Sequence, residues 1–407
     1  MSAASALRPD HGLTLLKGGD ELFPAMVEAI AAARAEVMVE TYIFEFQGTA
    51  IPVAEALEQA AARGVHVRVV VDGVGTGEIP PDWQVRWARA GVRWRVFSPV
   101  RGWRVLLPRH WRRMHRKLCV VDRDIAFCGG INLLDDHWDP NYGDLDKPRL
   151  DFAVRATGPL VADVHDTMTR LWRRLQVVRE AREHDMEGAM RAVREAARAG
   201  AEETVRPSVL QHGAVAALVL RDNFRFRRRI EGTYRVSIAQ ARREILIANA
   251  YFVPGVQLQR ALLRAARRGV KITLLVQGRY EYFMQYHASR AVYDVLLDAG
   301  IEIIEYEASF LHAKVALMDS PLGAVSTVGS SNLDPLSLLL AREANVFVRD
   351  DEFGAQLRAH LVEAMEEGHG KRVDRADHRR RPLMRRVLTW IAYALMRMAL
   401  LISGKRY

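Results

Sequence analysis

One string of residues occurs twice in this chain, and this repeat constrains the fold more than any other feature. It reads His-x-Lys, then Asp, then a glycine turn that ends in Asn. The first copy consists of His115, Lys117, Asp122, Gly129, Gly130 and Asn132, and the second of His312, Lys314, Asp319, Gly329, Ser330 and Asn332. Two matching half-sites indicate one active centre, built where the two copies meet.

The secondary structure predicted around the two copies repeats as well. Residues 37–46, 51–63 and 65–71 predict strand, helix and strand, and residues 245–253, 257–268 and 270–276 follow the same order. Strands that alternate with helices predict an α/β fold, and duplicated halves pack most simply about a pseudo-twofold axis. We therefore expect a first repeat over residues 1–200 that includes a helical linker at 160–199, a second repeat over 201–378, and a separate tail over 379–407.

Composition fits a folded protein with anionic partners. The chain has 407 residues, 49% of them hydrophobic, and a formal net charge of +10. A basic balance favours phospholipid headgroups, nucleic acid or acidic metabolites, and it does not choose among them. The first residues lack the apolar core of a signal peptide, and Cys119 and Cys128 show no paired spacing, so we expect a cytoplasmic catalytic part with reduced thiols.

Two segments favour lipid over the other anions. The tail places arginines before the apolar run 387–402, which contains Arg397 and is shorter than the ~20 residues of a spanning helix. We interpret it as an interfacial helix with basic flanks. Residues 101–114 mix Trp103 and Trp111 with arginines directly before His115, a composition typical of membrane interfaces. A packed crossover loop and a nucleic-acid contact remain the alternatives for this segment.

The residue types in the repeat suit phosphodiester exchange. Side chains alternate along a strand, so His115 and Lys117 point the same way, as do His312 and Lys314. One histidine can attack phosphorus while the other protonates the leaving alcohol, and each lysine can bind the phosphate oxygens. Asp122 and Asp319 follow apolar strands, a position better suited to fixing the lysine or a turn than to attack.

Supporting groups can be named in both halves. Asn132 and Asn332 offer hydrogen-bond donors to the transition state, and Asp151 and Glu343 are candidates to orient the two imidazoles. Whether each carboxylate serves the histidine of its own half or of the other half stays open. His137 has acidic neighbours without the spacing of a metal site, so we expect a reaction without a metal.

The repeated string resembles the signature of the phospholipase D superfamily, and both halves carry it. More narrowly, the strings at 40–44, 112–117, 221–223, 249–254 and 330–337 resemble those of bacterial cardiolipin synthases that lack N-terminal membrane spans. This resemblance implies two tandem phospholipase D-type α/β/α sandwich repeats, with the active site at their interface. Two departures stand out: Gly130 replaces the serine found at Ser330, and Ser320 to Gly323 lengthen the link that follows Asp319.

The resemblance also implies an activity. His115 would attack phosphatidylglycerol to form a phosphatidyl-histidine, and His312 would protonate the departing glycerol and then activate a second phospholipid headgroup, giving cardiolipin. The expected catalytic set is His115, Lys117, Asp122, His312, Lys314 and Asp319. We expect no cofactor, no nucleic acid and no obligate protein partner, with the enzyme peripheral on the cytoplasmic face of the bacterial cell membrane.

Several alternatives share these residues. A phospholipase D hydrolase or another transphosphatidylase would use the same site, and a nuclease-like phosphodiesterase would use the basic surface to follow phosphates. A lipid-binding adaptor with a relict site is disfavoured by the intact His and Lys in both halves. The acceptor, the order in which the histidines act, the oligomeric state and insertion of the tail stay open.

Overall fold

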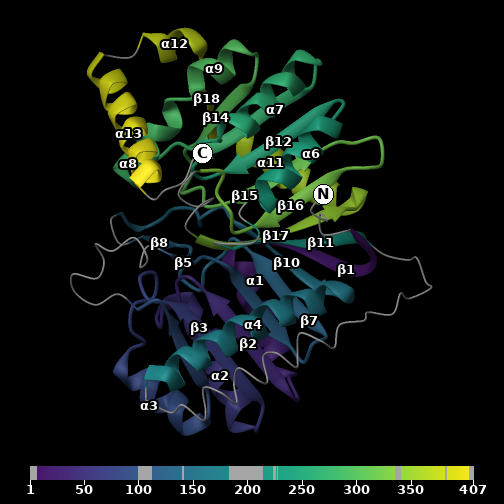
Figure 1. The fold of residues 1–407 in the computed structure, drawn as a ribbon, viewed down its shortest axis with the longest axis vertical. Helices are drawn as coiled ribbons and strands as arrows, with labels where there is room; N and C mark the ends of the chain where they lie inside the picture. The colour runs from purple at the N-terminus through teal and green to yellow at the C-terminus, as the bar shows by residue number, and fades with distance from the viewer. Residues whose placement is uncertain are drawn as a thin grey trace.

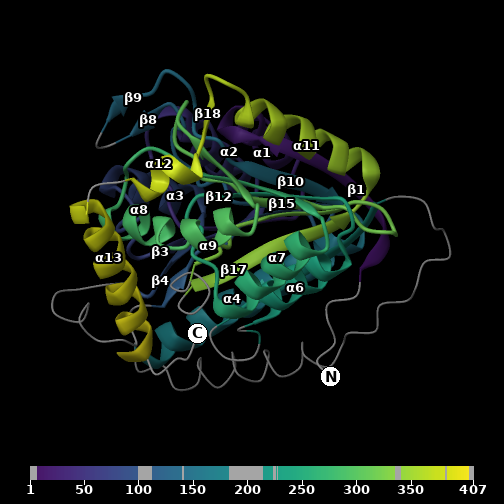
Figure 2. The same ribbon diagram turned by 90° about the horizontal axis from the view of Figure 1, so that it is seen from above.

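The computed structural model consists of two α/β halves, one above the other in Figure 1 and seen from above in Figure 2. It describes residues 7–99, 112–139, 142–182, 214–222, 226, 228–334, 341–380 and 383–402. The predicted boundary near residue 200 lies outside the described residues, as do residues 101–111 of the basic aromatic segment.

Each half contains a mixed sheet with the same strand order. In the first half the order is β1-β10-β7-β6-β2-β3-β4, and in the second it is β11-β17-β16-β15-β12-β13-β14, followed at the edge by β18. The first set is β1 (Arg8–Lys17), β2 (Glu36–Thr41), β3 (His66–Asp72), β4 (Arg93–Phe97), β6 (Lys117–Val121), β7 (Ile125–Gly129) and β10 (Phe152–Thr157). The second set is β11 (Ala214–Arg221), β12 (Glu244–Asn249), β13 (Lys271–Gln277), β14 (Glu302–Tyr306), β15 (Lys314–Met318), β16 (Val325–Gly329), β17 (Ala341–Arg349) and β18 (Gly370–Arg372).

The two sheets join through an antiparallel pair formed by β1 and β11. The strand order therefore reads the same outward from this pair in both directions, apart from β18. Such an order is what a pseudo-twofold axis between duplicated halves requires. The predicted arrangement of two repeats is confirmed.

Helices cover both faces of each sheet. The outer faces are covered by α1 (Gly18–Ala31), α2 (Ile51–Ala62) and α3 (Pro81–Ala90) in the first half and by α6 (Arg229–Gln240), α7 (Val256–Arg267) and α9 (Tyr293–Asp298) in the second. On the inner faces lie α4 (Pro159–Arg182) and α11 (Asp351–Met365). Strand alternation explains the layers, because Val37 and Val39 of β2 pack with the outer helices whereas Met38 faces inward.

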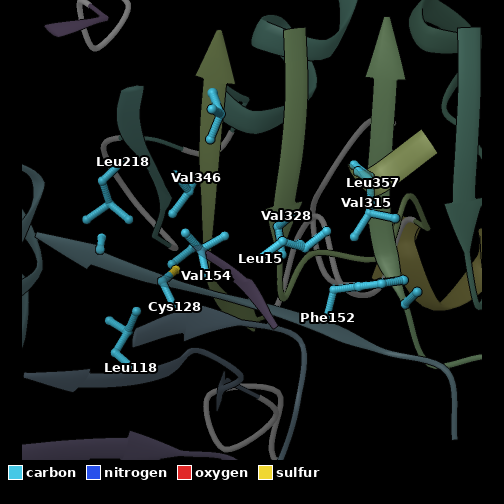
Figure 3. Close-up of a cluster of buried hydrophobic side chains, with 14 of the residues drawn as sticks. Leu15, Leu118, Cys128, Phe152, Val154, Leu218, Val315, Val328, Val346 and Leu357 are labelled. Atoms are coloured by element: carbon cyan, nitrogen blue, oxygen red, sulfur yellow. The ribbon is translucent and has the colours of Figure 1, made fainter. Parts of the chain in front are cut away.

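The inner faces share one hydrophobic core (Figure 3). Phe152 and Val154 of the first half lie in the same buried cluster as Val315, Val328 and Val346 of the second. Burial of this apolar surface in both halves at once stabilises their contact. The interface that carries the site is therefore part of the core of the protein.

Both predicted strands that precede the site end earlier than expected. The prediction for 37–46 becomes β2, which ends at Thr41, and that for 245–253 becomes β12, which ends at Asn249. The following residues leave the sheet because they bind the glycine turns instead: Leu133 N–H donates to the carbonyl of Ile43, and Val253 N–H to the carbonyl of Leu333. Apolar pattern alone does not separate strand residues from these buried segments.

Short elements complete the structure. They are η1 (Gly48–Ala50), β5 (Arg113–Met114), β8 (Trp138–Asp139), β9 (Gly143–Asp144), α8 (Phe283–Arg290), α12 (Arg375–Arg379) and the longer α13 (Leu383–Ile402). Within the described part of the chain, no helix combines the length and the apolar character needed to cross a membrane.

Candidate active site

Each histidine lies just before a central strand and is bonded to the backbone of the other half. His115 precedes β6, and its N–H donates to the carbonyl of Arg342 in β17 at 3.0 Å. His312 precedes β15, and its N–H donates to the carbonyl of Leu150 before β10 at 2.9 Å. These two hydrogen bonds cross the interface in opposite directions, and they bring the two copies of the repeated motif together there.

Two polar side chains that the sequence analysis did not select hold these segments. Asp72, at the end of β3, accepts the backbone N–H of Met114 at 2.8 Å, and Gln277, at the end of β13, accepts that of Leu311 at 2.9 Å. Both act on the residue immediately before a histidine. The sequence contains a pattern that could have identified both residues, because Asp72-Gly73 and Gln277-Gly278 end equivalent strands of the two repeats.

The carboxylates that orient the imidazoles come from the opposite halves. Nδ1 of His115 lies 3.2 Å from Oε2 of Glu343, and Nδ1 of His312 lies 2.6 Å from Oδ2 of Asp151. The carboxylate–histidine pairs therefore cross the interface. Neither half has a complete pair without the other.

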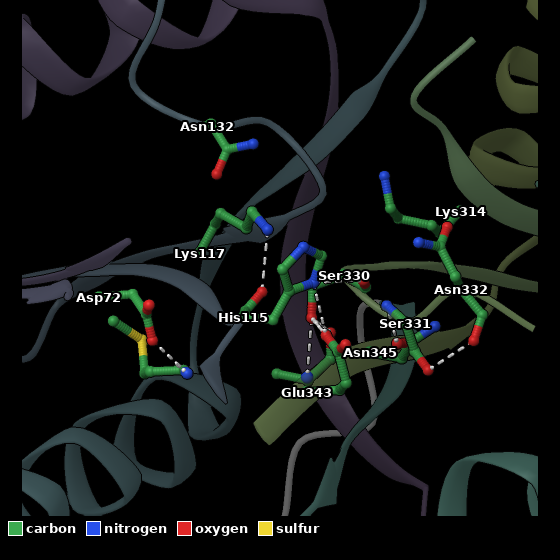
Figure 4. Close-up of polar contacts among 12 residues, drawn as sticks. Asp72, His115, Lys117, Asn132, Lys314, Ser330, Ser331, Asn332, Glu343 and Asn345 are labelled. Atoms are coloured by element: carbon green, nitrogen blue, oxygen red, sulfur yellow. Dashed lines mark hydrogen bonds and ion pairs between the residues drawn. The ribbon is translucent and has the colours of Figure 1, made fainter. Parts of the chain in front are cut away.

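The partners of His115 fix its tautomer. Its Nδ1 also lies 3.2 Å from the carbonyl oxygen of Ser330, a group that can only accept a hydrogen bond. Nδ1 therefore carries the proton, and the lone pair of Nε2 is free to attack. Figure 4 shows His115 between Lys117 and the pair formed by Ser330 and Glu343.

The departure at Gly130 has a steric reason. A Cβ atom on Gly130 would lie 2.3 Å from Oδ1 of Asp151, so only glycine allows this carboxylate its position. In the second half the longer Glu343 leaves room for Ser330, whose hydroxyl donates to Oε2 of Glu343. Gly130 with Asp151, and Ser330 with Glu343, are therefore matched sets, and the two half-sites are not equivalent.

The two lysines are buried close together. Lys117 and Lys314 donate to the carbonyls of His115 and His312, and Lys117 Nζ lies 5.4 Å from the centre of the Tyr42 ring. Burial, and then the ammonium of Lys314, lowers the pKa of Lys117 to about 7. A bound anion would reverse that effect, so the site favours a negatively charged ligand.

Burial also sets the protonation of the imidazoles. It lowers the pKa of His115, against the opposing effect of Glu343. For His312 burial is again the largest cause, and Lys314, Lys117 and His115 add to it, so the pKa falls well below its usual value. Burial raises the pKa of Asp151 to about 6, against Lys314. Burial therefore favours the neutral imidazole at both positions.

The predicted asparagines lie in the turns beside the site. Oδ1 of Asn132 accepts the N–H of Ile43 at 3.2 Å, which ties the first turn to the segment after β2. In the second half this anchoring falls to Asn249, which accepts the N–H of Leu333 at 3.1 Å, and Asn332 is buried next to it. Tyr42, with its ring centre 4.9 Å from that of His115, lines the first half-site.

Asp122 and Asp319 lie away from the other members of the expected catalytic set, and we propose that their role is structural. They follow the far ends of β6 and β15, roughly 16 Å from the lysines at a rise of ~3.3 Å per residue. Asp122 accepts the backbone N–H groups of Arg34, Ala35 and Glu36. Asp319 accepts the equivalent groups of residues 242–244. Each fixes the start of a central strand.

We expect Asp122→Ala to lower the free energy of unfolding by about 1–3 kcal/mol, because its backbone donors lose their acceptor. Turnover by the folded fraction should change little. Chemical denaturation and an activity assay measure the two quantities. Asp124→Ala, at an exposed position in the same turn, is the matched control. A loss of turnover larger than about 100-fold with unchanged stability would return Asp122 to the catalytic set.

Comparison with known proteins agrees with this architecture. The family model described as "Cardiolipin synthase, PLD-like domain" matches residues 26–145 and 234–365, one segment in each half and more than half of the chain. Cardiolipin synthase B of Escherichia coli K12 is 38% identical over 364 residues, covering 87% of this chain and 80% of the relative. Cardiolipin synthase B of Salmonella typhi is 37% identical with the same coverage.

A solved structure shares the fold across nearly the whole chain. The phosphatidylserine synthase of Haemophilus influenzae superposes with a TM-score of 0.62 at 12% identity, covering 95% of this chain and 93% of the other. Two repeats of this kind, with their histidine motifs at one interface, define an enzyme of the phospholipase D superfamily. Within that superfamily, the chain belongs to the cardiolipin synthase family of phosphatidyltransferases.

Proposed function

We propose that the protein makes cardiolipin by transferring a phosphatidyl group from one phosphatidylglycerol to the headgroup hydroxyl of a second. The observation that carries this proposal is the crossed pairing of His115 with Glu343 and His312 with Asp151. It provides two imidazoles, each with its Nδ1 on a carboxylate, beside two buried ammonium groups. The family membership of the chain supports the choice of lipid.

In the first step, Nε2 of His115 attacks phosphorus and the bond from phosphorus to the glycerol oxygen breaks. The fixed tautomer of His115 supports the nucleophilic role. Binding of the phosphodiester anion raises the pKa of His312, so its imidazole takes up a proton from solvent, and the resulting imidazolium donates that proton to the departing glycerol oxygen. Asp151 stabilises the imidazolium form of His312 at 2.6 Å. A phosphatidyl group remains on His115.

In the second step, the hydroxyl of the second phosphatidylglycerol gives its proton to His312, and its oxygen attacks phosphorus. The phosphorus–nitrogen bond to His115 breaks, and cardiolipin leaves with His115 neutral again. Lys117 and Lys314 neutralise the phosphate oxygens throughout, since both ammonium groups are buried beside the histidines. One phosphodiester replaces another, so the exchange requires no nucleotide.

We expect purified protein on phosphatidylglycerol vesicles to release cardiolipin and glycerol in equal amounts, because each transfer frees one headgroup. Mass spectrometry of the lipids and an enzymatic glycerol assay measure the two products. Phosphatidic acid as the sole lipid product would show that water replaces the acceptor and would make the protein a hydrolase. Absence of any lipid product would overturn the proposal.

We further propose that the enzyme acts as a peripheral protein on the cytoplasmic face of the bacterial membrane. Both substrates are bilayer lipids under the proposed reaction. The net charge of +10 favours an anionic surface.

A further inference from the structure

Helix α13 carries a continuous apolar face that no described element covers. Met384, Val387, Ile391, Leu395 and Met398 recur at helical spacing and are all exposed. Trp390 lies at the edge of this face and is 61% exposed. Exposed apolar surface of this extent on a described helix indicates a binding face.

The opposite side of α13 is fixed to the second half. Ala392 is buried against Ala288 of α8 and Val253, with Tyr393 packed on the same cluster. Val253 in turn donates its N–H to Leu333, next to Asn332 of the site. Both ribbon views place α13 alongside α8 at one end of the molecule (Figures 1 and 2). A short chain of contacts therefore sets the position of α13 relative to the site.

A second exposed group lies at the start of α8. Tyr280, Tyr282 and Phe283 precede and begin α8, and all three are exposed. The Tyr282 ring lies 6.3 Å from that of Tyr251, whose hydroxyl donates to Glu281. This aromatic segment is thus continuous with α8, the helix on which α13 rests.

The aromatic segment also borders the active site. The carboxylate of Glu281 acts on the buried ammonium of Lys314, whose pKa it raises against the larger lowering effect of burial. The aromatic segment therefore connects, through α8, the helix α13 with a residue beside Lys314.

Charge identifies what this face binds. Residues 379–407 contain eight Arg and Lys and no Asp or Glu. A tail with only positive charge repels a second copy of itself and attracts anionic headgroups. Exposed Trp and Tyr beside aliphatic side chains suit the boundary between headgroups and acyl chains. The chemistry is that of a lipid surface.

We propose that the exposed face of α13 and the aromatic segment Tyr280–Phe283 together form one docking surface for an anionic lipid bilayer. The inference rests on the proposed function, and it adds how the enzyme is oriented on the bilayer. The α13 face lies in the headgroup layer, and the aromatic segment brings the edge of the active site against the same layer. A lipid phosphate can then reach the histidines while its acyl chains stay in the bilayer.

The test compares charged substitutions on this surface with matched substitutions elsewhere. The variants are Val387→Glu/Ile391→Glu/Leu395→Glu on α13 and Tyr280→Ser/Tyr282→Ser/Phe283→Ser on the aromatic segment. The control is Val236→Glu/Leu322→Glu, at two exposed apolar positions outside the surface. Flotation with phosphatidylglycerol vesicles measures binding. Turnover is measured on the same vesicles and on short-chain phosphatidylglycerol dissolved as monomers.

We expect the α13 variant to bind vesicles about 100-fold more weakly, with a smaller loss for the aromatic variant, because apolar contacts with the bilayer are removed. Turnover on vesicles should fall with binding, while turnover on the monomeric lipid and the melting temperature stay near wild type. The control should bind as wild type does. If wild type binds vesicles but turns over neither lipid, the proposed reaction fails and the docking surface stands.

Two results would overturn the docking surface. One is wild-type vesicle binding by both variants. The other is a loss of dimerisation in light scattering with unchanged vesicle binding, since a second copy would then be the occupant of the face. The two variant sets alter separate elements, so a folding defect in one leaves the other as a test.

Discussion

Replacement of His115 by alanine should abolish both the covalent intermediate and cardiolipin, whereas His312→Ala should still form the intermediate from a suitable donor. His115 supplies the attacking nitrogen, and its Nδ1 proton is held by the carbonyl of Ser330 and by Glu343. His312 supplies a proton, which a nitrophenolate leaving group does not need. The order of the two histidines is therefore directly measurable.

A phosphatidyl nitrophenol substrate makes the measurement. With His312→Ala we expect one equivalent of nitrophenol in a burst and a protein heavier by one phosphatidyl group, because discharge of the intermediate needs the base. With phosphatidylglycerol as donor, the turnover rate of the same variant should fall by about 10²–10⁴-fold. His115→Ala should give neither burst nor adduct with either donor. An adduct on His115→Ala, and none on His312→Ala, would reverse the assigned roles.

Asp151→Asn should lower turnover by about 10²–10⁴-fold, far more than Glu343→Gln. Asp151 is the carboxylate on His312, at 2.6 Å, and its charge stabilises the imidazolium that forms as glycerol departs. His115 keeps the carbonyl of Ser330 as a second acceptor when Glu343 becomes an amide. Glu343→Gln therefore leaves the tautomer of His115 unchanged, whereas Asp151→Asn removes the negative charge that stabilises the imidazolium form of His312.

Steady-state rates on phosphatidylglycerol vesicles give the ratio between the two variants. Vesicle binding serves as the control, since neither carboxylate lies on the proposed docking surface. Loss of function in Asp151→Asn should spare the burst with the nitrophenyl donor, as in His312→Ala. Equal losses in both variants, with the burst abolished in each, would show that the carboxylates act on the same step and would contradict the asymmetric roles.

The sequence predicted the residues proposed for the chemistry better than it predicted the residues that hold them in position. Duplication of His-x-Lys in equivalent frames pointed to the histidines and lysines that lie at the interface. Both histidines precede their strands, so alternation along a strand does not describe how they lie relative to the lysines. Asp72 and Gln277 were passed over because their role is to hold a backbone N–H that belongs to another segment. Such a contact leaves no local pattern beyond a polar residue at the end of a strand.

The departure at residue 130 shows the same limit. In the sequence, Gly130 is a lost hydroxyl. In the structure, the missing side chain of Gly130 leaves the space that the Asp151 carboxylate occupies. At the equivalent position of the second half, the serine hydroxyl of Ser330 fits beside the longer Glu343 side chain and donates to it. Side-chain length and backbone space match within each half, and that relation becomes visible only when residues 130 and 151 lie together.

The amino-acid sequence alone determined the two-repeat α/β plan and the groups available for chemistry, because periodicity and duplication are local properties of the chain. Only the tertiary structure decided that each carboxylate serves the opposite half, and that Asp122 and Asp319 stand apart from the site. The physical reason is that β5 pairs with β17 and Leu150 pairs with Leu311, so each histidine leaves its own sheet to meet the other half. Hydrogen bonds between segments so distant in the chain depend on the packing of the shared core.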